Sequence, residues 1–360
     1  MRAPFKTTHF KTSYAQDLQL FQNSGQRFWY GLLALALVIA PFALPNYLLS
    51  QMVFIFIYSI VGLGLMLLAG YTGQMSIGHA AFMAVGAYTQ AALVGAGWPF
   101  LLALGSATLA AMVAGIVVGV PALRLKGIYL SIATLAFGFI IEEVITRWEH
   151  VTGGSAGLRV APPEILGVSL RSGQAFYGLC LAVLLLALWL TLNLLRSPAG
   201  RAFVAIRDSE ISAQSMGIRL ARFKTMSFAL SAGFAGVGGA LYAHKISFLS
   251  PEQFTVAQSI ELLMMIVIGG LGSIHGVFFG AVFMIVLPQL ISLVKDLLPA
   301  AIAGSAGLQP LIFGLVLLAF LLLEPLGLYG RWLKVRSYLE QFPYHRRSQS
   351  GRQRSYQKSA

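Results

Sequence analysis

Between two long apolar stretches lies a run of charged and hydroxyl residues, Arg196 to Met226 (RSPAGRAFVAIRDSEISAQSMGIRLARFKTM). This basic run could be a docking site for another protein. Its residues predict two short helices. Ser197 can cap the first, because its hydroxyl can accept a backbone N–H bond, and Pro198 suits the first helical position. Asp208 or Ser209 can cap the second helix in the same way.

The second helix is expected to be about two turns long, with Gly217 ending it in the left-handed conformation. A helix this short is not stable alone in water, so another surface must hold it. Glu210, Ala213 and Gly217 fall at i, i+3 and i+7 and therefore share one face. The apolar Ile211 and Met216 lie nearby. The alternative is a solvated loop helix without a partner.

The spacing Glu-x-x-Ala-x-x-x-Gly in a basic loop resembles the cytoplasmic coupling loop, or EAA loop, of ABC importer permeases. The longer run from Arg207 to His244 resembles, more narrowly, the branched-chain amino acid permeases of the LivM type. In that family the coupling helix docks in a groove of a separate ATPase subunit and passes its closing motion to the membrane helices. The resemblance implies that the ATPase-coupling residues are Arg207, Asp208, Glu210, Ile211, Ala213, Met216 and Gly217.

The composition excludes an ordinary soluble protein. Of the 360 residues, 57% are hydrophobic and only 10% are charged, whereas about a quarter is usual for soluble domains. The net charge is +13, and the basic residues that produce it are concentrated in the N-terminal segment, the central basic run and the C-terminal tail. This distribution indicates the positive-inside bias of membrane proteins rather than a face for nucleic acid. The single cysteine, Cys180, cannot form a disulfide within the chain.

Apolar stretches near the length of a bilayer-spanning helix, about 20 residues, follow one another along the chain. About ten crossings that start inside would place all the basic segments in the cytoplasm. Eight crossings are the alternative, because two of the stretches are rich in glycine and could be re-entrant. The stretches are 28–44, 48–69, 79–97, 100–122, 127–146, 174–195, 226–243, 259–274, 277–294 and 310–328.

The sequence therefore predicts an all-α, polytopic integral membrane protein of eight to ten transmembrane helices with a cytoplasmic coupling helix. Residues 1–27 are expected to be an uncleaved cytoplasmic segment. The permease domain is placed at 28–330, with the coupling loop at 196–225. The tail, 331–360, is basic and expected to be disordered.

Three glycines, Gly70, Gly73 and Gly78, interrupt an apolar stretch beside several polar residues, so helix is not expected between Gly70 and Gly78. Unwound backbone at membrane depth is tolerated only when it is buried in protein or lines a watery cavity. There it can offer N–H groups, hydroxyls and an amide to a polar solute. The alternative is an ordinary cytoplasmic hairpin turn. His79 could be a proton relay or pathway residue, or a hydrogen-bonded helix start.

This stretch resembles the AGYTGQ-S-GH-AF signature of the same permease family, and Leu123 to Leu158 is a third match. Relatives carry an acid after the glycine of LAFG, where this chain has Phe139, so the role of that acid does not carry over. Glu143 and Arg147 are spaced as a favourable helix pair, and Glu142 could face the pathway or the partner. The predicted pathway residues are Gly70, Thr72, Gly73, Gln74, Ser76, Gly78, His79 and Glu142.

Thr152, Gly153 and Gly154 match the family's external TGG turn, which is placed to meet the substrate or the protein that delivers it. A second glycine-rich break is expected between Ile268 and Phe283, without evidence of an inverted repeat. The clustered glycines of 233–239 are expected to pack helices closely.

The sequence lacks a phosphate-binding G-x-x-x-x-G-K-[ST] loop, a metal-ligand cluster and a G-x-S-x-G elbow, so neither catalysis nor a cofactor or metal is predicted. The resemblance implies a permease subunit in the bacterial cytoplasmic (inner) membrane. Its partners would be two ABC ATPase subunits, a second permease, expected to be a paralogue, and a periplasmic substrate-binding protein.

Three alternatives are kept. A secondary transporter driven by an ion gradient would place acids inside the membrane, whereas Glu142, Glu143, Glu261 and Glu324 are expected near span ends. An ABC permease for urea or short amides has the same general pattern. A purely structural or enzymatic membrane protein would leave the short capped helix unexplained.

Overall fold

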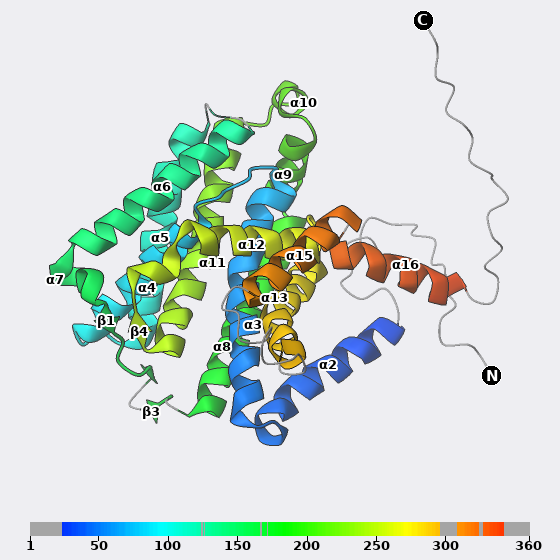
Figure 1. Ribbon diagram of the computed structural model, residues 1–360. Helices are drawn as coiled ribbons and strands as arrows, with labels where there is room; N and C mark the ends of the chain where they lie inside the picture. The colour runs from blue at the N-terminus through cyan, green and yellow to red at the C-terminus, as the bar shows by residue number, and fades with distance from the viewer. Residues whose placement is uncertain are drawn as a thin grey trace, which may run out of the picture.

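The computed structural model describes residues 24–123, 125, 127–165, 168–170, 172–295, 308–323 and 327–341, and they form a bundle of helices (Figure 1). The helices are α2 (Ser24–Ala43), α3 (Asn46–Leu65), the π-helix η1 (Met66–Tyr71), α4 (His79–Gly95), α5 (Phe100–Ala122), α6 (Ile128–Arg147), α7 (Glu149–Thr152), η2 (Gly154–Ala156), α8 (Gly173–Arg196), α9 (Pro198–Asp208), α10 (Glu210–Ser215), α11 (Leu220–Ile246), η3 (Pro251–Phe254), α12 (Val256–Gly269), α13 (Ile274–Lys295), α15 (Leu308–Leu323) and α16 (Gly327–Gln341).

Each predicted apolar stretch overlaps one of these helices, although the stretch 259–274 continues past the end of α12 at Gly269. Among the described residues, 7 helical segments are long and apolar enough to cross a membrane, and two further apolar helices, Arg27–Ala43 and Leu311–Phe320, are shorter. The prediction of an all-α polytopic membrane protein is confirmed, whereas the number of crossings stays a prediction. The seven segments are Asn46–Tyr71, Phe100–Pro121, Ile128–Arg147, Gly173–Arg196, Leu220–Ile246, Pro251–Gly269 and Ile274–Leu293.

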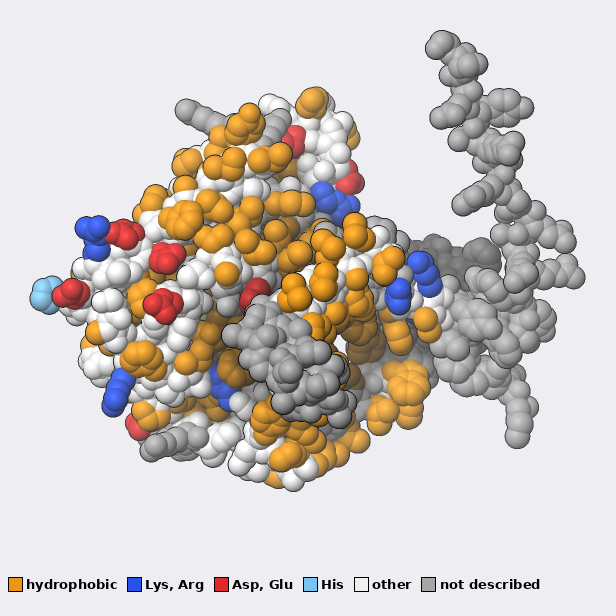
Figure 2. All heavy atoms as spheres, viewed as in Figure 1, with side chains coloured by type: hydrophobic (Ala, Val, Ile, Leu, Met, Phe, Trp, Pro, Cys, Tyr) orange, Lys and Arg blue, Asp and Glu red, His pale blue; other side chains and the backbone are white. Residues whose placement is uncertain are grey.

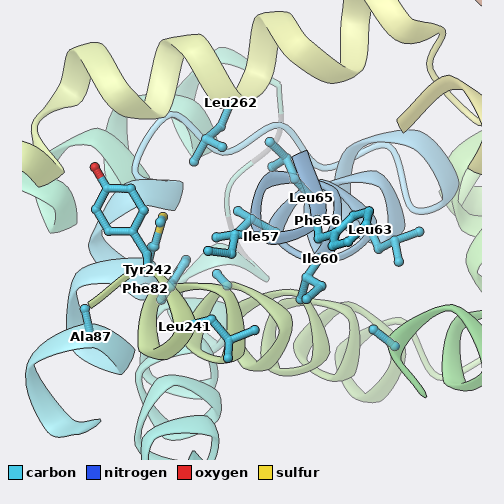
Figure 3. Packing of buried hydrophobic residues seen from close by; sticks show 14 of the residues in the cluster. Phe56, Ile57, Ile60, Leu63, Leu65, Phe82, Ala87, Leu241, Tyr242 and Leu262 are labelled. Atoms are coloured by element: carbon cyan, nitrogen blue, oxygen red, sulfur yellow. The ribbon is translucent and has the colours of Figure 1, made fainter. Parts of the chain in front are cut away.

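Two helices form the centre of the bundle. In both α3 and α11, 78% of the apolar segment is buried, while the corresponding share in α6 is only 17%. Figure 3 shows the side chains that fill the space between α3, α4, α11 and α12, among them Ile57, Ile60, Phe82 and Leu241. The outer helices instead turn large apolar side chains outward, and Figure 2 shows hydrophobic side chains over much of one face. Such a surface suits lipid rather than water.

Glycines bring α4 and α11 into backbone contact. A Cβ atom added to Gly239 would lie 2.0 Å from the carbonyl oxygen of Met83, and one added to Gly86 would lie 2.3 Å from that of Gly236. Neither position has room for a methyl group. Small residues allow this approach in lipid, where hydrophobicity does not drive helices together. The predicted packing role of the α11 glycines is therefore confirmed.

The second predicted break is also present, between α12 and α13. Gly270 and Gly272 adopt positive φ values of 120° and 81° in the turn. The two helices then pack closely, because a Cβ on Gly280 would lie 2.0 Å from the carbonyl oxygen of Met265. In Figure 1, α12 crosses the middle of the bundle.

Short strands fasten the loops at the end of the bundle where α11 ends. Strand β1 (Leu158–Arg159) pairs antiparallel with β4 (Phe248–Leu249), which ties the segment after α6 to the C-terminal end of α11. Strands β2 (Glu164–Ile165) and β3 (Val168–Ser169) form a second antiparallel pair.

The α4–α11 contact predicts the effect of Gly239→Val. The added side chain must displace the α4 backbone, so we expect a loss of about 1–3 kcal/mol in stability and a lower melting temperature of the detergent-solubilised protein. Gly178→Val is the matched control, because nothing lies within 4 Å of a Cβ at that helical position. Equal melting temperatures for the two variants would contradict the contact.

Candidate coupling and translocation site

The first break starts where α3 changes into the π-helix η1 and ends where α4 begins, with residues 72–78 outside any helix. Its polar groups find partners nearby. The Thr72 hydroxyl donates to the Leu67 carbonyl oxygen (2.9 Å), and the Gln74 N–H donates to the Leu68 carbonyl oxygen (3.0 Å). The Ile77 N–H donates to the Thr134 hydroxyl of α6 (3.0 Å). The break predicted between Gly70 and Gly78 is confirmed, and it is held from several sides.

Thr72, Gln74 and Ser76 are all buried, so the break is no loose surface turn. Gly73 takes a positive φ of 74°, which favours glycine. Gly78 packs on α6 so closely that a Cβ would lie 1.9 Å from the Thr134 carbonyl oxygen. The segment is therefore a fixed, buried stretch of unwound backbone.

His79, the first residue of α4, is fully buried, and neither ring nitrogen has a hydrogen-bond partner among the described residues. Its ring packs edge-on against Phe82 with the centroids 5.8 Å apart. Ser76 is likewise buried with its hydroxyl unpaired. Whether His79 is a pathway residue or a hydrogen-bonded helix start stays a prediction. Unpaired buried polar groups are costly and mark a site that something else can satisfy.

The two predicted short helices of the basic run are present as α9 and α10. The Ser197 hydroxyl accepts from the N–H groups of Ala199 and Gly200. Ser209, rather than Asp208, caps α10 by accepting from the Ser212 N–H. Gly217 has a φ of 83°, the left-handed conformation expected at the helix end. The caps fix where each helix begins and ends.

One side of α10 packs against the bundle, and the other side is exposed. Ala213 is buried, whereas Ile211 and Met216 are 78% and 84% exposed. The Glu210 carboxylate turns inward and forms an ion pair with the Lys224 ammonium at 2.6 Å, with the Lys224 side chain only 5% exposed. Because Lys224 lies in the second turn of α11, this pair ties α10 directly to the central helix.

Arg207, at the end of α9, joins the basic run to the first break. One guanidinium nitrogen donates to the Gly70 carbonyl oxygen at 3.1 Å, and another pairs with Asp208 at 3.0 Å. A step further in, the Ser227 hydroxyl of α11 donates to the Gln74 side-chain oxygen (3.4 Å). The structure therefore brings Arg207, Gly70 and Gly73 together, which their separation in sequence does not reveal.

The remaining predicted residues lie at the other end of α6. Glu143 pairs with Arg147, as their spacing predicts, and Glu142 is half-buried. Thr152 is buried, and its hydroxyl donates to the carbonyl oxygens of Ile145 (2.6 Å) and Trp148 (2.8 Å). Its hydroxyl also accepts from the N–H of Gly154 (3.2 Å).

Gly153 and Gly154 both take positive φ values, 73° and 57°. Together with the internal hydrogen bonds of Thr152, these conformations make the TGG turn a well-fixed end to α6.

Two buried polar contacts were not predicted. One is the Lys224–Glu210 pair, because Lys224 was counted only among the basic residues of the run. The other centres on His244, which accepts from Gln90 at Nε2 (3.1 Å) and meets the Ala161 carbonyl oxygen at Nδ1 (2.9 Å). The only sequence signal for the second contact was a polar residue, Gln90, within a predicted span.

The placement of the acids also differs in part from expectation. Glu261 lies in the middle of the membrane-capable segment Pro251–Gly269, not near its end. Glu324 lies outside the described residues. Among the residues that the structure describes, no group of three or more His, Cys, Asp or Glu side chains could hold a metal ion.

Comparison with known proteins gives the family. The family model described as "Branched-chain amino acid transport system / permease component" matches residues 47–323. The chain belongs to this family. The permease is thus a membrane transport component rather than an enzyme, and the predicted family is confirmed.

The relatives have similar names. The permease is 37% identical over 290 residues to the high-affinity branched-chain amino acid transport system permease protein LivM of Escherichia coli (strain K12), covering 73% of this chain and 68% of the relative. It is 38% identical to LivM of Salmonella typhimurium (strain LT2) over 261 residues, 65% of this chain and 61% of the relative.

A more distant relative is the autoinducer 2 import system permease protein LsrC of Salmonella paratyphi A, which is 28% identical over 316 residues, 82% of this chain and 87% of the relative. No solved structure gives a significant match.

The ion pair predicts the effect of Lys224→Met. This change removes the Lys224 ammonium from its ion pair with the half-buried Glu210 carboxylate, and we expect a loss of about 1–3 kcal/mol in stability. Adding Glu210→Gln should recover part of the loss. The melting temperatures of the solubilised variants measure both effects, with Arg222→Met as the exposed control on α11. If Lys224→Met and Arg222→Met have the same melting temperature, the ion pair does not stabilise α10.

Proposed function

We propose that the permease is a translocating subunit of an ATP-driven ABC importer for branched-chain amino acids in the bacterial inner membrane. A periplasmic binding protein delivers the substrate, and the partners are two ATPase subunits and a second permease paralogous to this one. The main support is the identity of 37% to the LivM permease over most of the chain. The lower identity of 28% to the LsrC permease favours amino acids over autoinducer 2 as the substrate.

The ATPase would dock on α10. Ile211 and Met216 are exposed on a short helix whose other side is tied down by Ala213 and Glu210. Such exposed apolar side chains on a water-facing loop are costly unless a partner covers them. The proposal places residues 196–225 in the cytoplasm, with α10 as the coupling helix.

Movement of α10 would reach the membrane helices by two polar links. The Glu210–Lys224 pair would pull on α11, and Arg207 would pull on the Gly70 carbonyl at the start of the first break. Both links are direct side-chain contacts that are partly shielded from water, so they would transmit force without a flexible loop between. ATPase closure would in this way switch the bundle between inward-facing and outward-facing states.

The translocation pathway would pass the first break. Ser76 and His79 present polar atoms that no described protein group satisfies, and the break also carries Thr72 and Gln74. A polar solute could satisfy such groups when the helices part. Glu142 would lie along the same route, and Thr152 to Gly154 would lie near the external entrance.

The topology that fits these roles has about ten crossings, with the N-terminal segment, the coupling loop and the tail all in the cytoplasm. The permease domain would run from residue 28 to residue 330. The positive-inside rule supports this arrangement, because all three segments are basic.

Charge at the tip of α10 should weaken ATPase binding. We expect Ile211→Asp to reduce the ATPase subunits that copurify with the membrane-extracted permease by at least about tenfold, which corresponds to about 1.4 kcal/mol. Ala221→Asp is the control, because it adds the same charge at an exposed position in the first turn of α11. Undiminished copurification with Ile211→Asp would place the docking surface elsewhere.

Substrate and energy source can be tested together in membrane vesicles that contain the complete importer. Uptake of radiolabelled leucine should require ATP and the binding protein, should be competed by isoleucine and valine, and should survive an ionophore that collapses ion gradients. Uptake abolished by the ionophore would support the gradient-driven carrier instead. Competition by urea or acetamide, but not by valine, would assign the permease to amides.

A further inference from the structure

A cluster of polar aromatic side chains lies where α3, α11 and α12 meet, apart from the first break. Tyr58 of α3 and Tyr242 of α11 pack edge to face with ring centroids 6.4 Å apart. The Gln258 side-chain amide of α12 donates to the Tyr58 hydroxyl at 3.1 Å. Figure 3 shows the Tyr242 ring projecting from α11 with its hydroxyl toward α12.

Further aromatic rings extend this cluster. Phe254 lies 5.9 Å from the Tyr242 ring, and Phe54 lies 6.3 Å from it on another side. Tyr88 of α4 packs on Phe254 at 6.1 Å, and its buried hydroxyl has no partner among the described residues. Three helices and a loop therefore supply one continuous aromatic surface.

Glu261 is the acid of this cluster. It lies three residues after Gln258 on α12, and therefore on the same helical face as the amide that contacts Tyr58. Its side chain is exposed, and among the described residues no Lys, Arg or His forms an ion pair with it. A charge within a membrane-capable segment is expensive and is kept where it faces a pathway or a ligand.

The nearest cation on α11 points elsewhere. The Lys245 ammonium lies over the Phe54 ring, 5.4 Å from its centroid. Among the described residues, no cation therefore pairs with the Glu261 carboxylate, and Lys245 contacts Phe54 rather than Tyr58 or Tyr242. A carboxylate beside aromatic faces is the combination that recognises an organic ammonium group.

We propose that Glu261, Tyr58 and Tyr242 bind the α-ammonium group of the amino acid on its way through the permease. Gln258 positions the Tyr58 hydroxyl, and the rings of Phe254 and Tyr88 line the wall beside it. This inference rests on the proposed function as an amino acid importer. It adds a recognition point on the α12 face, separate from the Gly70–Gly78 break, and explains why an acid lies in the middle of that segment.

The test uses the complete importer in proteoliposomes, with radiolabelled leucine as the probe. We expect Glu261→Gln to lower leucine turnover at least tenfold, while assembly with the ATPase subunits and ATP hydrolysis stimulated by the loaded binding protein stay within twofold of wild type. Glu261→Asp should restore part of the transport. Glu252→Gln is the matched control, because this exposed glutamate precedes α12 and lies outside the cluster.

A second pair of variants separates the ring from the hydroxyl. Tyr58→Phe keeps the aromatic face and should transport better than Tyr58→Leu, which removes it. During turnover, leucine-loaded binding protein should also slow the modification of Glu261 by a carbodiimide, as measured by mass spectrometry, whereas unloaded binding protein should not.

The outcomes are distinct. If the wild type transports leucine, and the Glu261→Gln and Glu252→Gln variants have the same leucine turnover, the ammonium site is overturned and the proposed function stands. If the wild type with all its partners transports no leucine, the proposed function itself is overturned. Failure of Glu261→Gln to assemble would show a structural role for Glu261. Sodium-dependent uptake by the wild type would assign the carboxylate to an inorganic cation. Failed assembly of Glu261→Gln and sodium-dependent uptake would each overturn the ammonium site.

Discussion

The backbone contact between α4 and α11 is the constraint on which the rest of the structure depends. Gly86 and Gly239 bring the two helices so close that the carbonyl oxygens of one face the Cα atoms of the other. In lipid this contact, rather than the hydrophobic effect, holds helices together. Because α11 is also packed by α3 and α5, it forms the axis to which the first break and the basic run are both attached.

The basic run is attached to that axis by polar contacts rather than by packing alone. Lys224 and Ser227 lie three residues apart on α11, so they share a face. One holds α10 through Glu210, and the other holds the first break through Gln74. A single helical turn of α11 thus contacts both regions that the sequence marks as unusual. The hydrogen bond from Arg207 to the Gly70 carbonyl oxygen completes the set. The three contacts join α11, the basic run and the first break to one another.

Features that depend on neighbouring residues were predictable from the sequence. The helices follow from apolar stretches of suitable length, the break from three glycines, and the α9 cap from Ser197 and Pro198. The choice between Asp208 and Ser209 was left open, since either residue can cap and only the local backbone decides. The phase of a helix around its own axis could not be predicted in the same way, because nearly every residue in these spans is apolar.

Contacts across the bundle were therefore beyond the sequence. Arg207 and Gly70 are 137 residues apart, and Gln258 and Tyr58 are 200 apart, so no local pattern reports either bond. The lack of a partner for the His79 ring among the described residues could not be predicted either, because it depends on how segments distant in sequence pack around it. Glu261 was expected at a span end because the hydropathy of its stretch did not reveal that η3 extends the segment backward to Pro251.

The shortness of α4 has a consequence for how the protein is made. At 17 residues, α4 is about 25 Å long, which is less than the roughly 30 Å of a bilayer core. It also begins at the buried, unpaired His79. Its partner α11 starts 125 residues after α4 ends (Gly95 to Leu220), a delay of roughly 6–25 s during synthesis. During that time α11 has not been synthesised, so α4 cannot pack against the glycines of α11. The order of synthesis therefore leaves the next helix, α5, which packs on α4, or the cell's insertion machinery, to cover α4 until α11 is made.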